Sequence, residues 1–160
     1  MQQQVIKIFT DGSCHTRQKT GAWTAILLTG DGKTYLKGIT HETTHNRMEL
    51  LAVIYSIDFV NENHPGASMV IYTDSQYVVR IPQRKERLKK NHFHTKKGAS
   101  VQNPDLLQNL ILQIETHDIE FVKIEAHQRP AAMQNNQENP VLYNIEADKL
   151  ARELLRQHTR

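Results

Sequence analysis

The stretch that decides the fold is Gln4–Ser13, QVIKIFTDGS. Residues 5–9 are apolar or β-branched except for one lysine, a composition that predicts a buried strand. The polar Asp11-Gly12-Ser13 that follows is expected to break this strand. Asp11 would then place a carboxylate at the end of a central strand.

Two more strands are expected directly after the first. Residues 22–28 form one strand, Gly30-Asp31-Gly32 is a hairpin signal, and residues 34–39 return as the next strand. Short connections of this kind predict an antiparallel meander of three strands.

The remainder of the chain alternates between helical and strand patterns. The sequence predicts a deeply packed helix from Asn46 to about Asn61, then a buried strand, Met69–Thr73, parallel to the first. The later elements are a short helix (75–81), a basic helix (83–90), a helix from Pro104 with Asn103 as N-cap, a strand (119–124) and a final helix (Ile145 to about Gln157). This order predicts an α/β fold. Its mixed five-stranded sheet has strands 1–3 antiparallel and strands 4–5 parallel to strand 1, and helices flank it.

Size and composition indicate a single domain over residues 1–160. The chain is 38% hydrophobic and 23% charged, as is usual for a globular protein. No apolar run is long enough to cross a membrane, and no signal peptide precedes the first strand. The single cysteine, Cys14, excludes an internal disulfide. We therefore expect a cytoplasmic protein without a membrane partner, and a monomer by default.

Two polar segments stand out. Residues 80–97 contain eight basic residues and one acid, Glu86, whereas the rest of the chain is net acidic. Such a local excess indicates a patch for a polyanion, and its alternative is a solvated charged helix. We expect a basic protrusion over about 80–102. The segment 128–143 has low hydrophobicity and two prolines, so a long loop is expected there.

Four acidic residues stand at junctions between predicted elements, and each has an ordinary structural explanation. Asp11 could be a turn residue, and Glu49 could form a capping box with Asn46. Asp74 could cap the helix that follows it, and Asp148 could be a solvated residue in the first turns of the last helix. No one of the four indicates catalysis by itself.

Considered together, the four acids point to a metal site. Asp11 and Asp74 follow strands predicted to be parallel, so both carboxylates should emerge at one edge of the sheet, where α/β folds bind ligands. Clustered carboxylates repel one another unless cations neutralise them. Oxygen ligands suit Mg²⁺, and a pair of such ions is a usual device for hydrolysing phosphodiesters.

The motifs around these acids resemble those of type 1 ribonuclease H, the ribonuclease HI family, over nearly the whole chain. The motifs are TDGSC (Thr10–Cys14), NRMELLA (Asn46–Ala52), YTDSQYV (Tyr72–Val78), an isolated His127 and NIEADKLA (Asn144–Ala151). The resemblance implies a ribonuclease H-like fold. It also implies endonucleolytic cleavage of the RNA strand of RNA–DNA hybrids, leaving 5′-phosphate and 3′-hydroxyl ends.

The resemblance also assigns roles to the site residues. Asp11 would bridge two Mg²⁺ ions (Mn²⁺ being the alternative ion), with Glu49 and Asp74 completing the ion at the leaving 3′ oxygen. Asp148 would help to hold the ion that activates water. His127 would assist proton transfer or product release, although a lone histidine is ordinarily a surface residue.

Recognition of the hybrid is assigned in the same way. Residues that match the family's hybrid-reading positions are Cys14, Asn46, Ser75, Gln76 and Asn144; those that match its basic protrusion include Arg84, Lys85, Arg87, Lys89 and Lys90. His45 departs from the pattern, because this position is commonly Asn in the family.

Two other functions are compatible with parts of this pattern. One is a non-catalytic module that binds hybrids or duplexes through the basic patch. The other is a DNA nuclease or resolvase of related fold. Retention of all four carboxylates argues against the first, and the NRMEL and DSQ motifs argue against the second.

Overall fold

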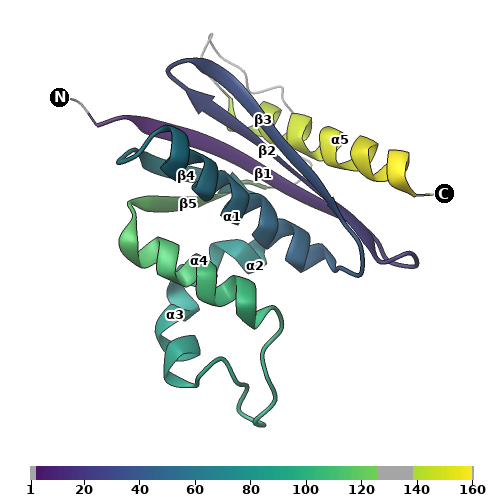
Figure 1. Cartoon of the computed structure of the whole chain (residues 1–160), viewed down its shortest axis with the longest axis vertical. Coiled ribbons are helices and arrows are strands. Elements are labelled where there is room, and N and C mark those ends of the chain that lie inside the picture. The colour runs from purple at the N-terminus through teal and green to yellow at the C-terminus, as the bar shows by residue number, and fades with distance from the viewer. Residues whose placement is uncertain (1–2, 126–138, 160) are drawn as a thin grey trace.

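The computed structural model describes residues 3–125 and 139–159 as five strands and five helices (Figure 1). The strands are β1 (Val5–His15), β2 (Thr20–Thr29), β3 (Gly32–Thr40), β4 (Ser68–Thr73) and β5 (Ile119–Lys123). The helices are α1 (His45–Asn63), α2 (Gln76–Val79), α3 (Ile81–Lys90), α4 (Pro104–Thr116) and α5 (Pro140–His158). No helix among the described residues is both long enough and apolar enough to cross a membrane.

The strands form one mixed sheet in the order β3-β2-β1-β4-β5, with β1 at its centre. β1 pairs antiparallel with β2 and parallel with β4, and β4 pairs parallel with β5. β2 and β3 form the antiparallel hairpin. The predicted fold class is therefore confirmed, including the direction of every strand.

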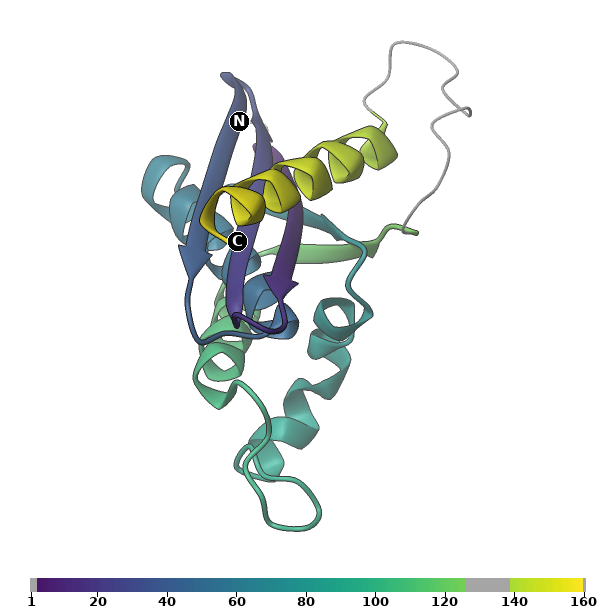
Figure 2. The same ribbon diagram turned by 90° about the vertical axis from the view of Figure 1, so that its right-hand side faces the viewer.

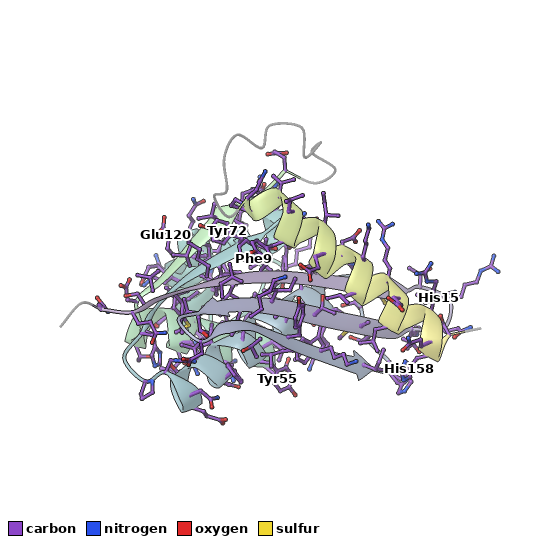
Figure 3. The ribbon with its side chains drawn as sticks, turned by 90° about the horizontal axis from the view of Figure 1, so that it is seen from above. Phe9, His15, Tyr55, Tyr72, Glu120 and His158 are labelled. Carbon is purple, nitrogen blue, oxygen red and sulfur yellow. The ribbon has the colours of Figure 1, made fainter. Side chains whose placement is uncertain are left out.

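Helices cover both faces of the sheet, and the alternation along β1 explains how (Figures 1 and 2). Ile6 and Ile8 point into a core that they share with the apolar residues of α1 and α4. Phe9 points to the opposite face, where its ring stacks on Tyr72 with centroids 4.8 Å apart (Figure 3). Tyr143 of α5 lies against the same ring, so α5 covers this second face.

The end of β1 differs from the prediction. The polar Asp11-Gly12-Ser13 does not break the strand, because antiparallel pairing with β2 continues to His15 opposite Thr20. Only the parallel pairing ends early, with Phe9 opposite Tyr72. A strand with a long antiparallel partner keeps its backbone hydrogen bonds through polar residues, and the local sequence alone does not reveal that partner.

The start of α5 also differs from the prediction, which placed a loop up to Tyr143. The helix begins at Pro140, after Asn139, whose side chain accepts a hydrogen bond from Val141 N at 3.0 Å. Proline suits the first turn of a helix because its missing N–H is not needed there. Of the predicted loop, residues 128–138 lie outside the described part.

The start of α1 differs from the prediction by one residue, whereas the predicted N-cap of α4 is confirmed in position. Helix α1 begins at His45 and its N-cap is Thr44, whose hydroxyl accepts from Arg47 N, so Asn46 and Glu49 form no capping box. Asn103 occupies the N-cap position of α4 without a capping hydrogen bond from its side chain. Its Oδ1 instead accepts from Arg47 Nη1 at 3.4 Å, which links α4 to α1.

The close packing of α1 on β1 depends on Gly12. A Cβ atom at this position would lie 2.9 Å from Met48 Cβ and 3.0 Å from Glu49 N. Both contacts are closer than real Cβ atoms ordinarily tolerate, and one of them is with backbone. A residue without a side chain therefore lets α1 bring Glu49 beside β1.

We predict that Gly12→Ala lowers the free energy of unfolding by about 1–3 kcal/mol, the usual effect of overpacking a core. Urea denaturation of the purified chain measures this change. Gly30→Ala is the matched control, because its Cβ would meet only the end of the Gln4 side chain at 3.9 Å. Equal stability of the two variants would contradict the packing argument.

Candidate active site

Three carboxylates from three different elements converge at the end of the β1–β4 pairing. Asp11 lies in β1 opposite Thr24, two residues beyond the last parallel pair. Glu49 comes from the second turn of α1, and Asp74 directly follows β4. Each offers an oxygen, and these oxygens all lie within 4.8 Å of one another. The expected meeting of Asp11 and Asp74 at one sheet edge is therefore confirmed.

Asp148 of α5 adds a fourth carboxylate to the lining of the same pocket. Helix α5 is fixed there by a buried hydrogen bond of 2.8 Å from Thr24 Oγ1 to Ala147 O. Since α5 begins at Pro140, Asp148 lies in its third turn, not in the first turns as predicted. The four acids open into one pocket of about 240 Å³, lined by Asp11, Gly12, Ser13, His45, Glu49, Asp74, Asn144, Ile145, Asp148 and Arg152.

Burial makes this cluster electrostatically unfavourable. Asp11 is 4% exposed and Glu49 is 1% exposed. Loss of hydration, followed by the charges of Glu49 and Asp74 and the contact with Asp148, raises the pKa of Asp11 to about 10. Burial also raises the pKa of Glu49 and that of Asp74.

Two basic side chains partly compensate the cluster from its rim. His45 Nε2 lies 3.2 Å from Glu49 Oε1, and Arg152 Nε lies 3.1 Å from Asp148 Oδ1. Each pair spans four residues of one helix, the spacing that brings side chains together. The hydrogen bond to Glu49 raises the pKa of His45. Among the described residues, neither Asp11 nor Asp74 forms an ion pair, so much of the repulsion at the buried centre remains.

The residues present fit a hard divalent cation. Every candidate ligand is a carboxylate oxygen, the donor that Mg²⁺ and Mn²⁺ prefer. Glu49 Oε2 is buried and accepts no hydrogen bond from the described residues. A cation between the carboxylates would supply the missing partner and relieve their repulsion.

The residues assigned to hybrid recognition are spread around this pocket. Asn144 lines it, and its buried Oδ1 has no partner among the described residues. Cys14 lines a neighbouring pocket, and His45 lines both this pocket and the acidic one. Ser75 caps α2 by accepting from Val78 N, and Gln76 lines a groove beside α3. Asn46 is half-buried and does not line the acidic pocket.

The basic segment projects away from the sheet as α3 and the chain that follows it (Figure 1). Arg84 and Arg87 line a groove of about 600 Å³ together with Gln76, Tyr77, Arg80 and Gln83, and none of these residues is acidic. Other basic side chains in the segment have acidic partners. Lys89 Nζ lies 2.9 Å from Glu115, and Lys85 Nζ lies 3.7 Å from Glu86.

Sequence reasoning and structure differ on several site residues. His127 lies outside the described residues. The reasoning from motifs missed Arg152 altogether and treated His45 only as a departure at the hybrid-binding surface. The signal that could have found both is the four-residue spacing from a candidate ligand on a predicted helix, in His45–Glu49 and Asp148–Arg152.

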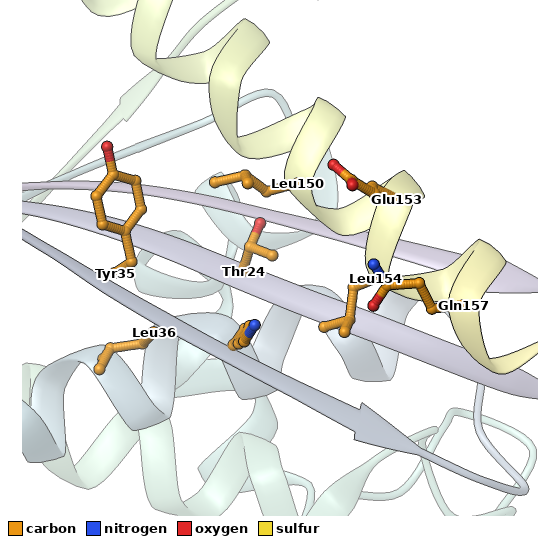
Figure 4. A pocket seen from close by; sticks show the side chains of 8 residues that line it. Thr24, Tyr35, Leu36, Leu150, Glu153, Leu154 and Gln157 are labelled. Carbon is orange, nitrogen blue, oxygen red and sulfur yellow. The ribbon is translucent and has the colours of Figure 1, made fainter.

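A second pocket, of about 330 Å³, lies between α5 and the β2–β3 hairpin (Figure 4). It is lined by Thr24, Tyr35, Leu36, Lys37, Leu150, Glu153, Leu154 and Gln157. A single acid among these residues does not make a cation cluster. The acidic pocket is therefore the better candidate for chemistry.

Comparison with known proteins identifies the family. The family model described as RNase H matches residues 3–156. The ribonuclease H of Dechloromonas aromatica (strain RCB) is 39% identical over 126 residues, 78% of this chain and 83% of that protein. The ribonuclease H of Chlorobium luteolum (strain DSM 273 / BCRC 81028 / 2530) is 33% identical over 155 residues, 96% of this chain and 97% of that protein.

The chain belongs to the RNase H family. It is therefore a nuclease, an enzyme of the hydrolase class. Among solved structures, LC9-RNase H1, described as a type 1 RNase H with the type 2 active-site motif, superposes with a TM-score of 0.78 at 21% identity. That alignment covers 99% of this chain and 75% of the other. The PFV RNase H domain superposes with a TM-score of 0.72 at 19% identity. That alignment covers 95% of this chain and 94% of the other. These likenesses confirm the ribonuclease H-like fold.

We predict that Asp11→Asn stabilises the metal-free RNase H. The folded protein binds the Asp11 proton more tightly than the unfolded chain, whose carboxyl has the ordinary pKa of 3.8. The free energy of unfolding of the wild type should therefore fall as pH rises from 5.5 to 8.5. That of the variant should fall less over the same range. At pH 8.5 the free energy of unfolding of the variant should exceed that of the wild type by at least about 1 kcal/mol, since a shift of one pKa unit corresponds to about 1.4 kcal/mol.

Urea denaturation in EDTA at both pH values measures this difference. Asp31→Asn, at the exposed β2–β3 turn, is the control and should change stability by less than about 0.5 kcal/mol. The same dependence on pH in wild type and Asp11→Asn would show that burial does not penalise the Asp11 charge.

Proposed function

We propose that this chain is an endoribonuclease that hydrolyses the RNA strand of RNA–DNA hybrids and leaves 5′-phosphate and 3′-hydroxyl ends. The observation that carries the proposal is the convergence of Asp11, Glu49, Asp74 and Asp148 on one pocket. The family match over residues 3–156 supports a single ribonuclease H domain.

The four carboxylates would hold two Mg²⁺ ions, with Mn²⁺ as the alternative. Following the resemblance, Asp11 would be a ligand of both ions, Glu49 and Asp74 would be ligands of one, and Asp148 of the other. When bound, such a pair activates water and stabilises the leaving oxygen of a phosphodiester. The buried carboxylates would remain ionised while they hold such cations.

His127 completes the proposed machinery. It would assist proton transfer or product release, since imidazole titrates near neutral pH. The support is its position in the order of family motifs, after β5 and before α5.

The proposed substrate is supported by the surroundings of the acidic pocket. Asn144 lines this pocket, and its buried Oδ1 has no hydrogen-bond partner among the described residues; an amide oxygen can accept a hydrogen bond from a 2′-hydroxyl. Cys14, Asn46, Ser75 and Gln76 are proposed to contact the hybrid beside it. A foamy viral protease-reverse transcriptase of similar fold has been solved in complex with an RNA/DNA hybrid.

The basic protrusion would bind backbone phosphates of the hybrid. Arg84 and Arg87, in a groove without acidic residues, are the best placed for this. Lys90 is exposed on the same helix, whereas Lys85 and Lys89 would have to exchange their acidic partners for phosphate.

The direct test is cleavage of a labelled RNA–DNA hybrid, compared with RNA–RNA and DNA–DNA duplexes, in Mg²⁺ and then in EDTA. We expect Mg²⁺-dependent cutting of the RNA strand of the hybrid alone. Asp11→Asn should abolish cutting while hybrid affinity stays within a few-fold, because phosphate and groove contacts persist.

Other outcomes would contradict this proposal in distinct ways. Binding of the hybrid without cutting would favour the non-catalytic module, and cutting of DNA would favour a DNA nuclease or resolvase. Loss of binding together with cutting in Asp11→Asn would make the carboxylate cluster a docking element.

We predict that Arg84→Ala combined with Arg87→Ala weakens hybrid binding by the inactive Asp11→Asn chain. The slope of log affinity against log salt should fall by about 1–2, because each lost phosphate contact contributes about 0.9. Lys89→Ala should have a smaller effect, because Glu115 already neutralises this lysine. Fluorescence anisotropy at several salt concentrations measures the affinity and the slope for each variant. Equal slopes in all variants would show that the hybrid does not bind in the groove of Arg84 and Arg87.

A further inference from the structure

The contact between His45 and Glu49 differs from the other contacts of the acidic pocket. Nε2 of the imidazole lies 3.2 Å from Glu49 Oε1, while the side chains are 60% and 2% exposed respectively. An ionised carboxylate can only accept a hydrogen bond, so the imidazole is the donor. A solvent-facing ring thus reaches inward to one oxygen of a buried acid.

The local rules of helix formation do not account for His45. The residue is the first of α1, after the N-cap Thr44. Histidine has modest helix propensity, and the positive end of the helix dipole favours acidic side chains, not basic ones. What the position does provide is a four-residue spacing to Glu49 on the same face.

The two oxygens of Glu49 have different surroundings. Oε1 accepts from His45, whereas Oε2 is buried and has no hydrogen-bond partner among the described residues. Asp11 and Asp74 each offer an oxygen within 4.8 Å of a Glu49 oxygen. The imidazole therefore fixes the carboxylate by one oxygen and leaves the other for a cation.

We propose that His45 is a positioning residue that orients Glu49 for a divalent cation. This inference rests on the cation site of the proposed function. Partners that hold a metal ligand from outside typically change metal affinity by 10- to 100-fold when they are removed. Asn, which the resemblance gives as the common residue here, has a shorter side chain that does not extend as far as the imidazole Nε2. Gln carries an N–H donor with comparable reach.

The test measures Mg²⁺ affinity directly, by isothermal titration of the full, EDTA-treated chain without nucleic acid. We expect His45→Ala and His45→Asn to raise the Mg²⁺ dissociation constant about tenfold or more. His45→Gln should keep it within about threefold of wild type, because the donor is retained. His158→Ala, at the exposed end of α5, controls for loss of an imidazole and should match wild type.

Two results would overturn the inference. One is an unchanged Mg²⁺ dissociation constant in His45→Ala, which together with weaker hybrid binding would make His45 a substrate contact. The other is an equal loss of Mg²⁺ affinity in His45→Gln and His45→Ala. Metal-free melting temperatures identify any variant whose loss comes from unfolding.

The same measurements separate this inference from the proposed function. A wild-type chain that binds Mg²⁺ without cutting hybrids would contradict the function and leave the His45 comparison valid. A wild-type chain that cuts hybrids while His45→Ala keeps its Mg²⁺ affinity would contradict the inference alone. Absence of Mg²⁺ binding by the wild type would overturn both.

Discussion

Carboxylates that are taken out of water repel one another, and the architecture of this protein concentrates that repulsion at one point. Asp11 lies in the central strand, Glu49 reaches it because Gly12 admits α1, and Asp74 emerges from the neighbouring parallel strand. Helix α5 brings Asp148 from the other face. Divalent cations held by these carboxylates would offset the cost of burying their charges, so fold and proposed chemistry are linked through the same four residues.

Much of this arrangement could be predicted from the sequence. The apolar run in 5–9 and the hairpin signal at Gly30-Asp31-Gly32 were sufficient for the central strand and the meander. A helix before Met69–Thr73 implied a parallel strand, and therefore a common edge for Asp11 and Asp74. These inferences held because they depend on periodicity and on the direction of connections, which are local properties of the chain.

The features that sequence reasoning missed depend on partners distant in the chain. β1 continues past Asp11 because β2 lies beside it, and α5 starts at Pro140 because Asn139 caps it. The four-residue spacings to Glu49 and Asp148 are visible in the sequence. Only the fold shows that His45 and Arg152, both largely exposed, contact carboxylates of the acidic pocket.

The most direct test of the account is to locate the cations. Crystals of the wild-type chain grown with Mn²⁺ should show an anomalous scattering peak among the oxygens of Asp11, Glu49 and Asp74. A second peak should appear near Asp148 when a non-cleavable hybrid is also bound. Mn²⁺ is suited to this because it prefers the same oxygen ligands as Mg²⁺. Intact carboxylates at these positions with no anomalous peak between them would contradict the central claim.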